Sequence, residues 1–319
     1  MISTLDLARL CGVSQGTVDR ALHDRPGIGK KTRARILAAV RKHGYQPHPA
    51  ARELLTGDRR LVGAILPAAN SVFFLDLMKA IRAEIVSAGF SLFLVQADGR
   101  REFLAALRDF AARRSRAVLL IPPDDVTPIP REVLSCGADL VALANPCATR
   151  TVPFFGPDEI QTGRDAVAYL AGKGHTRILH VTYARKAYAI EARARGYCEA
   201  MQARGGEPVV LRPLEPGSLR RALDRHCPTA LFCHNDWMAL SVMRLLEASR
   251  IQVPGDISVL GVDNSPTFVE LCPGITTLAY PTAEIACAIR NLLATRRRKF
   301  SIPSCAVVER STVAKSTGG

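Results

Sequence analysis

Residues 14–22 have the sequence Ser-Gln-Gly-Thr-Val-Asp-Arg-Ala-Leu, which predicts a short helix. Ser14 is a favourable N-cap residue, because its hydroxyl can accept a hydrogen bond from a backbone amide of the first turn. An apolar stripe follows at i, i+3 and i+4 spacing, formed by Val18, Ala21 and Leu22. The other face carries polar side chains and one glycine. The pattern therefore predicts a helix that packs along one face and leaves the other exposed.

Another helix is predicted immediately before this one, over residues 3–10. Ser3 and Asp6 have the spacing of a capping box at its start. A third helix is predicted over residues 30–43, with Gly44 as its C-terminal stop. The first two helices are joined by a short turn that contains glycine. This arrangement indicates a helix-turn-helix, whose second helix can enter a DNA major groove.

The positive charge of the chain is concentrated at this end. The chain has 319 residues, of which 48% are hydrophobic and 23% are charged, as in globular proteins, and its net charge is +14. Residues 1–60 contain twelve lysines and arginines but only five acids, so half of the excess lies in under a fifth of the sequence. This distribution favours a nucleic-acid-binding segment over a uniformly basic surface.

The nine cysteines form no Cys-x-x-Cys pair, and most lie in apolar runs. We therefore expect buried free thiols in a reducing compartment, with neither a metal site nor a cofactor. The N-terminus lacks the apolar core of a signal peptide, and no apolar stretch is long enough to cross a membrane. These features predict a cytoplasmic protein.

From residue 61 onward, short apolar strands alternate with longer helices. Continuous apolar runs, as in parallel strands buried on both faces, occur at residues 61–66, 91–95, 117–121 and 140–144. A second series of strands is predicted at residues 177–182, 208–211, 230–233 and 257–262. Helices are predicted between them, for example at residues 74–88, 189–204 and 237–249. The two series indicate two α/β lobes with a small-molecule site in the cleft between them.

The order of these parts resembles the lactose-repressor family of bacterial transcription regulators. In the N-terminal segment, the family's spacing is matched by Asp6-Leu7-Ala8, Gly12-Val13-Ser14, Thr17-Val18, Thr32-Arg33 and Gly44-Tyr45-Gln46-Pro47. In the rest of the chain, segments in family order are Gly174-His175-Thr176-Arg177-Ile178, Asn235-Asp236 and residues 256–263. Residues 158–164 are similar to ribose-type periplasmic sugar-binding proteins.

The resemblance implies an all-α helix-turn-helix headpiece at residues 1–45 and a hinge with a helix at residues 46–60. An α/β two-lobed core like periplasmic binding proteins, with two doubly wound parallel sheets, would follow at residues 61–319. We expect the N-lobe at about 61–147 plus 282–299 and the C-lobe at about 148–281 plus 300–319. The implied protein is a homodimer on two DNA half-sites.

The resemblance also implies which residues contact DNA. Positions that read base edges are Gln15, Gly16 and Arg20, and positions that contact phosphates are Ser14 and Thr17. Gln pairs bidentately with adenine and Arg with guanine, whereas glycine offers no side chain. Leu54, with Ala51 beside it, matches the hinge leucine that enters the minor groove. Asp19 is open to several interpretations: it orients Arg20 or Arg25, or reads a cytosine amino group.

Eight positions correspond to effector contacts in the family: Asn70, Phe73, Phe74, Asn145, Arg193, Asn235, Asp263 and Tyr280. Asn145 and Tyr280 differ from the residues of ribose-type binders, which makes ribose an unfavourable ligand. A sugar or polyol is the expected class. For Phe73 and Phe74 the alternative is core packing, for Asp263 a helix cap, and for Arg193 a solvated charge.

The sequence contains no phosphate-binding glycine motif and no carboxylate pair at a catalytic spacing. His175 and His180 are interpreted as structural, and residues 296–299 as a solvated helix end. The principal hypothesis is a DNA-binding repressor controlled by an effector, with induction or co-repression left open. The alternatives are a sugar-processing enzyme with an incidental basic N-terminus, or an architectural DNA-binding protein that needs no ligand.

Overall fold

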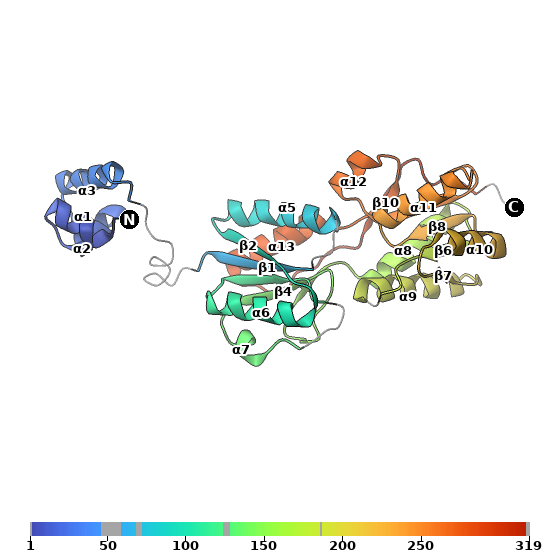
Figure 1. Ribbon diagram of the computed structural model, residues 1–319, viewed down its shortest axis with the longest axis horizontal. Helices are drawn as coiled ribbons and strands as arrows, with labels where there is room; N and C mark the ends of the chain where they lie inside the picture. The colour runs from blue at the N-terminus through green and yellow to red at the C-terminus, as the bar shows by residue number, and fades with distance from the viewer. Residues whose placement is uncertain (1, 46–58, 68–71, 124–127, 186, 317–319) are drawn as a thin grey trace. The chain divides into compact units, whose positions relative to one another are not determined.

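The computed structural model describes residues 2–45, 59–67, 72–123, 128–185 and 187–316 (Figure 1). The chain forms two compact units, Met1–Arg59 and Arg60–Gly319, which are described separately below. The hinge helix expected over residues 46–60 lies outside the described residues, apart from Arg59 and Arg60. No described helix has both the length and the apolar character needed to cross a membrane.

The first unit contains three helices, α1 (Thr4–Cys11), α2 (Gln15–Leu22) and α3 (Lys30–Lys42). The predicted capping box at Ser3 is confirmed, because its side chain accepts from the backbone of Asp6 and the Asp6 carboxylate accepts from the backbone of Ser3. The turn between α1 and α2 contains Gly12 in the left-handed conformation (φ 58°), which glycine adopts without steric cost. Side chains from all three helices are fully buried together: Leu7, Val18 and Ile36.

The first lobe of the second unit is a parallel sheet with strand order β2-β1-β3-β4-β5. Its strands are β1 (Leu61–Leu66), β2 (Ser91–Gln96), β3 (Ala117–Leu120), β4 (Asp139–Leu143) and β5 (Phe154–Phe155). Apolar side chains of α5 (Val72–Ser87) and α13 (Thr282–Thr295) share one core cluster with β1. Those of α6 (Gly99–Ala112) and α7 (Arg131–Leu134) share another cluster with β3. The two clusters correspond to helices on both faces of the sheet (Figure 1).

The second lobe has the strand order β11-β10-β9-β8-β6-β7, in which only β11 is antiparallel to its neighbour. Its strands are β6 (Ile178–Val181), β7 (Val209–Leu211), β8 (Ala230–Cys233), β9 (Ser258–Asp263), β10 (Thr276–Ala279) and β11 (Ala306–Val308). Its helices are α8 (Glu159–Gly172), α9 (Tyr188–Gln202), α10 (Pro216–His226), α11 (Asp236–Ala248) and α12 (Pro266–Leu271). The predicted fold class, three N-terminal helices followed by two parallel α/β lobes, is confirmed.

Strand β2 differs from the prediction that all the apolar runs are buried on both faces. It lies at the edge of the sheet and pairs only with β1. Phe93 and Leu94 are 49% and 41% exposed. The prediction was wrong here because apolar composition does not reveal which strand occupies an edge.

The division between the lobes also differs from the predicted one at residue 147. Strand β5 pairs in parallel with β4, so Phe154 and Phe155 belong to the sheet of the first lobe. The expectation of buried cysteines holds only in part: all nine thiols are free, but Cys227 is exposed and five others are only partly buried. Cys227 ends α10 in the left-handed conformation at the surface.

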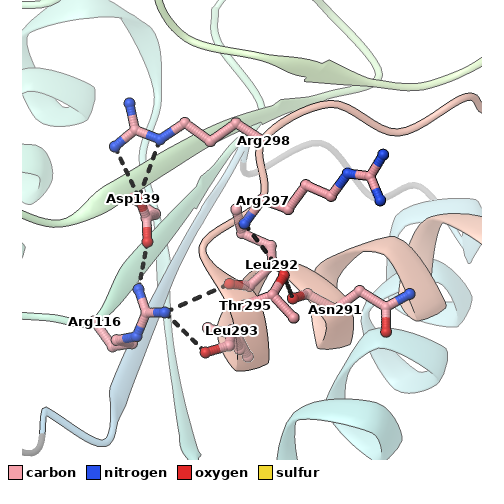
Figure 2. A network of polar contacts seen from close by, with 8 residues as sticks. All are labelled: Arg116, Asp139, Asn291, Leu292, Leu293, Thr295, Arg297 and Arg298. Atoms are coloured by element: carbon pink, nitrogen blue, oxygen red, sulfur yellow. Dashed lines mark hydrogen bonds and ion pairs between the residues drawn. The ribbon is translucent and has the colours of Figure 1, made fainter.

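Residues 296–299 are not simply the solvated helix end that the sequence predicts. Arg298 donates to the buried carboxylate of Asp139 through Nη2, at 2.8 Å (Figure 2). Arg116 pairs with the other oxygen of the same carboxylate and donates to the carbonyl oxygen of Leu293 at 2.8 Å. Asp139 is 2% exposed, so its charge is compensated by these two guanidinium groups. The cluster fixes the C-terminal end of α13 to β3 and β4.

We expect Asp139→Asn to lower the free energy of unfolding by about 3–5 kcal/mol, because it leaves the buried Arg116 without its counter-charge. Urea unfolding of the full chain measures this change. The control is Asp109→Asn, which breaks the exposed pair with Arg113 and should leave the midpoint unchanged. Equal midpoints for the two variants would contradict the role of Asp139.

Candidate functional site

The predicted DNA-contacting residues of α2 lie at its N-terminus and along its exposed side. Ser14 caps the helix, since its Oγ accepts from the backbone of Thr17 at 3.2 Å. The two hydroxyl oxygens of Ser14 and Thr17 lie 2.9 Å apart. The exposed residues are Ser14, Gln15, Gly16 and Arg20, while Thr17 is half-buried. A helix N-terminus with two hydroxyls suits a phosphate, because its free amides carry partial positive charge.

Contacts within the first unit settle which residue Asp19 orients. Its carboxylate pairs with Arg25 at 3.0 Å and lies 3.5 Å from Nε2 of His23. The side chain of Arg20 has no hydrogen-bond or ion-pair partner among the described residues, although its carbonyl oxygen accepts from the backbone of Arg25 at 2.9 Å. Gln15 donates to the hydroxyl of Thr4 at 2.9 Å. The other three predicted contacts lie outside the described residues: Ala51, Leu54 and Asn70.

A cavity of about 420 Å³ lies between the two lobes of the core. Its wall includes every predicted effector contact that the structure describes: Phe73, Phe74, Asn145, Arg193, Asn235, Asp263 and Tyr280. The rings of Phe73 and Tyr280 meet edge to face, 4.8 Å apart, and the ring of Phe74 lies 5.3 Å from that of Phe73. Residues that were not predicted as effector contacts also line it, among them Glu159, Tyr183, His234, Trp237 and Phe268.

Arg193 lies in the cavity wall with its charge compensated inside the protein. Its Nε donates to Oε2 of Glu159 at 2.5 Å, and its Nη2 donates to Oε1 at 3.0 Å. Its Nη1 donates to the carbonyl oxygen of His234 at 2.6 Å. The side chains of Arg193 and Glu159 are almost fully buried, at 4% and 1% exposed. The guanidinium is therefore a positioned hydrogen-bond donor and not a free cation.

Two glycines allow α8 and α9 to bring this ion pair together. A Cβ on Gly163 of α8 would lie 2.2 Å from the carbonyl oxygen of Arg193. A Cβ on Gly196 of α9 would lie 1.9 Å from the carbonyl oxygen of Ile160. The helices thus touch backbone to backbone, one turn from Glu159.

Asn235 and Asp263 follow parallel strands at the carboxyl edge of the second sheet, where such folds bind ligands. Asn235 caps α11, and its Oδ1 accepts from Met238 at 2.9 Å and from the Tyr183 hydroxyl at 3.1 Å. Asp263 has a φ of 120°, a strained backbone conformation for a residue with a side chain. Burial raises the pKa of Asp263 well above that of an ordinary carboxyl group.

Asp236 lies just beyond the cavity wall and was not predicted as a site residue. Its carboxylate accepts from the Thr277 hydroxyl at 2.7 Å and from the backbone of Asn264 at 2.8 Å. Burial raises the pKa of Asp236 to about 6. These bonds connect α11 to β10 and to the residue that follows Asp263, so Asp236 positions the cavity wall.

Two buried polar atoms of the wall have no hydrogen-bond partner among the described residues. They are the hydroxyl oxygen of Tyr280 and Nδ1 of His234. Tyr280 is 6% exposed and His234 is 7% exposed. Buried polar atoms in proteins are nearly always paired, so these two atoms lack a partner, which the described residues do not supply. Within the described residues, no group of three or more His, Cys, Asp or Glu side chains could hold a metal ion.

We expect Gly196→Ala to destabilise the core by at least about 1–3 kcal/mol, because the added methyl group meets backbone that cannot move aside locally. The matched control is Gly172→Ala at the end of α8, where no atom lies within 4 Å of the added carbon. That change should raise stability by about 0.5–1 kcal/mol through helix propensity. Urea unfolding distinguishes the two, and equal stability would contradict the close helix contact.

Comparison with known families matches both parts of this architecture. Residues 4–48 match the bacterial regulatory proteins of the lacI family, and residues 167–314 match a periplasmic binding protein-like domain. The chain is 27% identical over 301 residues to the HTH-type transcriptional repressor PurR of Vibrio vulnificus, covering 89% of each chain. It is also 27% identical over 342 residues to PurR of Aliivibrio fischeri, covering 98% of each.

Solved structures show the same fold. The lac repressor dimer bound to operator and the anti-inducer ONPF is 21% identical, with a TM-score of 0.81 over 98% of this chain and 99% of that one. A complex of the transcriptional regulator CelR with cellobiose is 24% identical, with a TM-score of 0.66 over 98% and 100%. The curated relatives are repressors and not enzymes. The chain therefore combines a lacI-family helix-turn-helix domain with a periplasmic binding protein-like domain and is a DNA-binding transcriptional regulator with a ligand-binding core.

Proposed function

We propose that this protein is a cytoplasmic, homodimeric repressor whose affinity for operator DNA is set by a neutral sugar or polyol in the cavity between the lobes. The observation that carries this proposal is the composition of the cavity wall. It combines aromatic rings with a few buried polar groups that are fixed in place, as small-molecule sites do. A similar regulator was solved with cellobiose, which supports the same ligand class here.

The pairing of Arg193 within the wall favours a neutral effector over an anionic one at this position. The guanidinium of Arg193 is already paired with Glu159, so a phosphate or carboxylate would find no uncompensated charge there. Tyr280, His234 and Asp263 instead offer buried hydrogen-bonding atoms. Hydroxyl groups can both donate to and accept from such atoms, which supports a sugar or polyol.

Control of DNA binding requires that the effector bind differently to two arrangements of the lobes. The lobes already contact each other beside the cavity. Asp76 of α5 accepts from the backbone of Thr267 at 3.1 Å and from its hydroxyl at 3.0 Å. Asp76 also accepts from the hydroxyl of Ser265, which lines the cavity. A ligand that touches both lobes would change this contact.

The homodimer is supported by apolar surface on the first lobe. Phe93 and Leu94 are exposed on the edge strand β2, and Leu75 and Val86 are 64% and 51% exposed on α5. Exposed apolar groups of this size are typical of association surfaces. Two copies would also present two recognition helices to the two half-sites of an operator.

The experiment that tests the proposal is selection of duplexes from a random-sequence DNA library by the full-length protein, repeated with a panel of sugars and polyols. We expect one enriched, partly symmetric sequence and one or more sugars that change its affinity. A protein without residues 1–57 should enrich no sequence but keep its thermal shift with the same sugars. Enrichment by that truncated protein would contradict the assignment of DNA recognition to the headpiece.

We expect Gln15→Ala to relax preference at a single base pair of the selected duplex, since a bidentate pair contributes about 1–3 kcal/mol of discrimination. Competition between duplexes that differ at one position measures it. The control Thr4→Val removes the hydroxyl that holds Gln15 in the free protein but leaves Gln15 itself. It should keep the preference, and a uniform loss with Gln15→Ala would show that Gln15 does not read a base.

We expect Tyr280→Phe to weaken the active sugar by about tenfold, because it removes a hydroxyl whose pairing is worth roughly 1.4 kcal/mol. Stability without sugar should stay the same or rise, since that hydroxyl is buried and unpaired in the free protein. Isothermal titration and thermal unfolding report the two effects. Tyr188→Phe, outside the cavity wall, is the control, and equal sugar affinity of both variants would contradict the role of Tyr280.

A further inference from the structure

We propose that the core itself carries a second DNA-contacting surface, which binds phosphates without regard to sequence. The surface lies at the amino edge of the first-lobe sheet and is formed by two loops, residues 113–116 and 296–299. These loops, called the basic edge below, contain seven cations: Arg113, Arg114, Arg116, Arg296, Arg297, Arg298 and Lys299. The proposal rests on the function proposed above.

The two loops meet at the edge where the chain enters the core. The backbone of Arg116 donates to the carbonyl oxygen of Leu61, the first residue of β1, at 2.7 Å. The carbonyl oxygen of Arg60, one residue earlier, accepts from the start of β2 at 2.9 Å. The second loop is connected to this edge through Asp139. The side chain of Asp139 accepts from Arg298, and its backbone amide donates to the carbonyl oxygen of Arg116 at 3.1 Å.

Two of the seven cations hold the loops in place, while a third, Arg113, forms an exposed ion pair. Arg116 and Arg298 share the buried Asp139, and Arg113 pairs with Asp109 at 2.7 Å. Arg116 also fixes the last turn of α13 through the carbonyl oxygens of Leu292 and Leu293 (Figure 2). The loops are therefore built on a buried, hydrogen-bonded framework that limits their movement.

The other four cations have no ion pair among the described residues and are exposed: Arg114, Arg296, Arg297 and Lys299. Figure 2 shows that the side chain of Arg297 points away from Asp139, although Arg298 beside it turns inward. Arg114 and Arg296 both have a positive φ, of 53° and 57°. Each therefore lies in a tight turn that ends its helix.

Unpaired cations that a rigid framework holds together repel one another, so a polyanion would bind with a gain in free energy. The headpiece is joined to this same edge, and the segment between Tyr45 and Arg60 can span at most about 50 Å. A duplex held by the headpiece would therefore be tethered to the core through the chain that enters at this edge. The chemistry fits the DNA backbone, which carries one charge per about 1.7 Å of helix axis.

The test compares two full-length variants that lose the same charge. The basic-edge variant keeps Arg116 and Arg298 and carries Arg296→Gln, Arg297→Gln and Lys299→Gln. The control changes three exposed second-lobe arginines that have no ion pair among the described residues: Arg221→Gln, Arg225→Gln and Arg250→Gln. The control also includes one turn residue, since Arg250 has a φ of 59°.

Affinity for a random-sequence duplex of about 40 base pairs is measured between about 50 and 200 mM salt. Each phosphate contact adds about 0.9 to the magnitude of the slope of log K against log salt concentration. Loss of three cations should therefore reduce the slope of the basic-edge variant by up to about 2.7 per protomer. The control should keep the wild-type slope. Equal slopes for the two variants, whether reduced or unchanged, would overturn the proposal, as would wild-type protein that does not bind this duplex.

Two further measurements separate this inference from the proposed function. Urea unfolding should give the same midpoint for wild type and both variants, because the buried framework is intact. Selection from the random library should enrich the same sequence with the basic-edge variant as with wild type. If the wild-type protein enriches a sequence but the two variants have equal salt slopes, only the second DNA-contacting surface is contradicted. If the wild-type protein enriches no sequence, the proposed function is contradicted.

Discussion

The buried ion pair between Arg193 and Glu159 is the interaction on which the effector-binding core depends. Burying two charges costs several kcal/mol for each ion, and the pair repays this only with close geometry and further hydrogen bonds. The bidentate contact and the bond from Nη1 to the His234 carbonyl supply both. That geometry requires α8 and α9 to touch, which the glycines at 163 and 196 permit. Helix packing and the chemistry of the cavity therefore have a single origin.

The rest of the cavity is built on the same constraint. Strands β8 and β9 end beside the ion pair, and their carboxyl ends place Asn235 and Asp263 in the wall. The side-chain oxygen Oδ1 of Asn235 caps the N-terminus of α11. The same side chain therefore fixes the start of this helix and lines the cavity. Pairing of Arg193 with Glu159 leaves a wall in which buried hydrogen-bonding atoms and shape can select the ligand. Discrimination between neutral ligands is best achieved in this way.

Local signals in the sequence predicted much of this structure, and long-range pairing limited the rest. The capping box at Ser3, the stripe of α2 and the apolar runs of the central strands depend on neighbouring residues, so their positions followed directly from the sequence. The partners of Arg193 and Arg298 lie 34 and 159 residues away. No periodicity reveals such pairs, so Arg298 was interpreted as part of a solvated helix end and Glu159 was not predicted as a site residue. Likewise, β2 was expected to be buried because its composition matches that of a central strand.

In the proposed function, the two edges of the first-lobe sheet would link the effector to DNA. The carboxyl edge faces the cavity through Asn145 and the start of α5, while the amino edge receives the chain at Arg60 and carries the basic edge. A parallel sheet packed on both faces moves as one body, because its interior is too dense to deform gradually. If the first lobe shifts when a ligand binds, Arg60 and the four exposed cations of the basic edge would therefore move together. Coupling through such a body has an electrostatic part, so the effect of the sugar on DNA affinity should decrease as salt screens the phosphates.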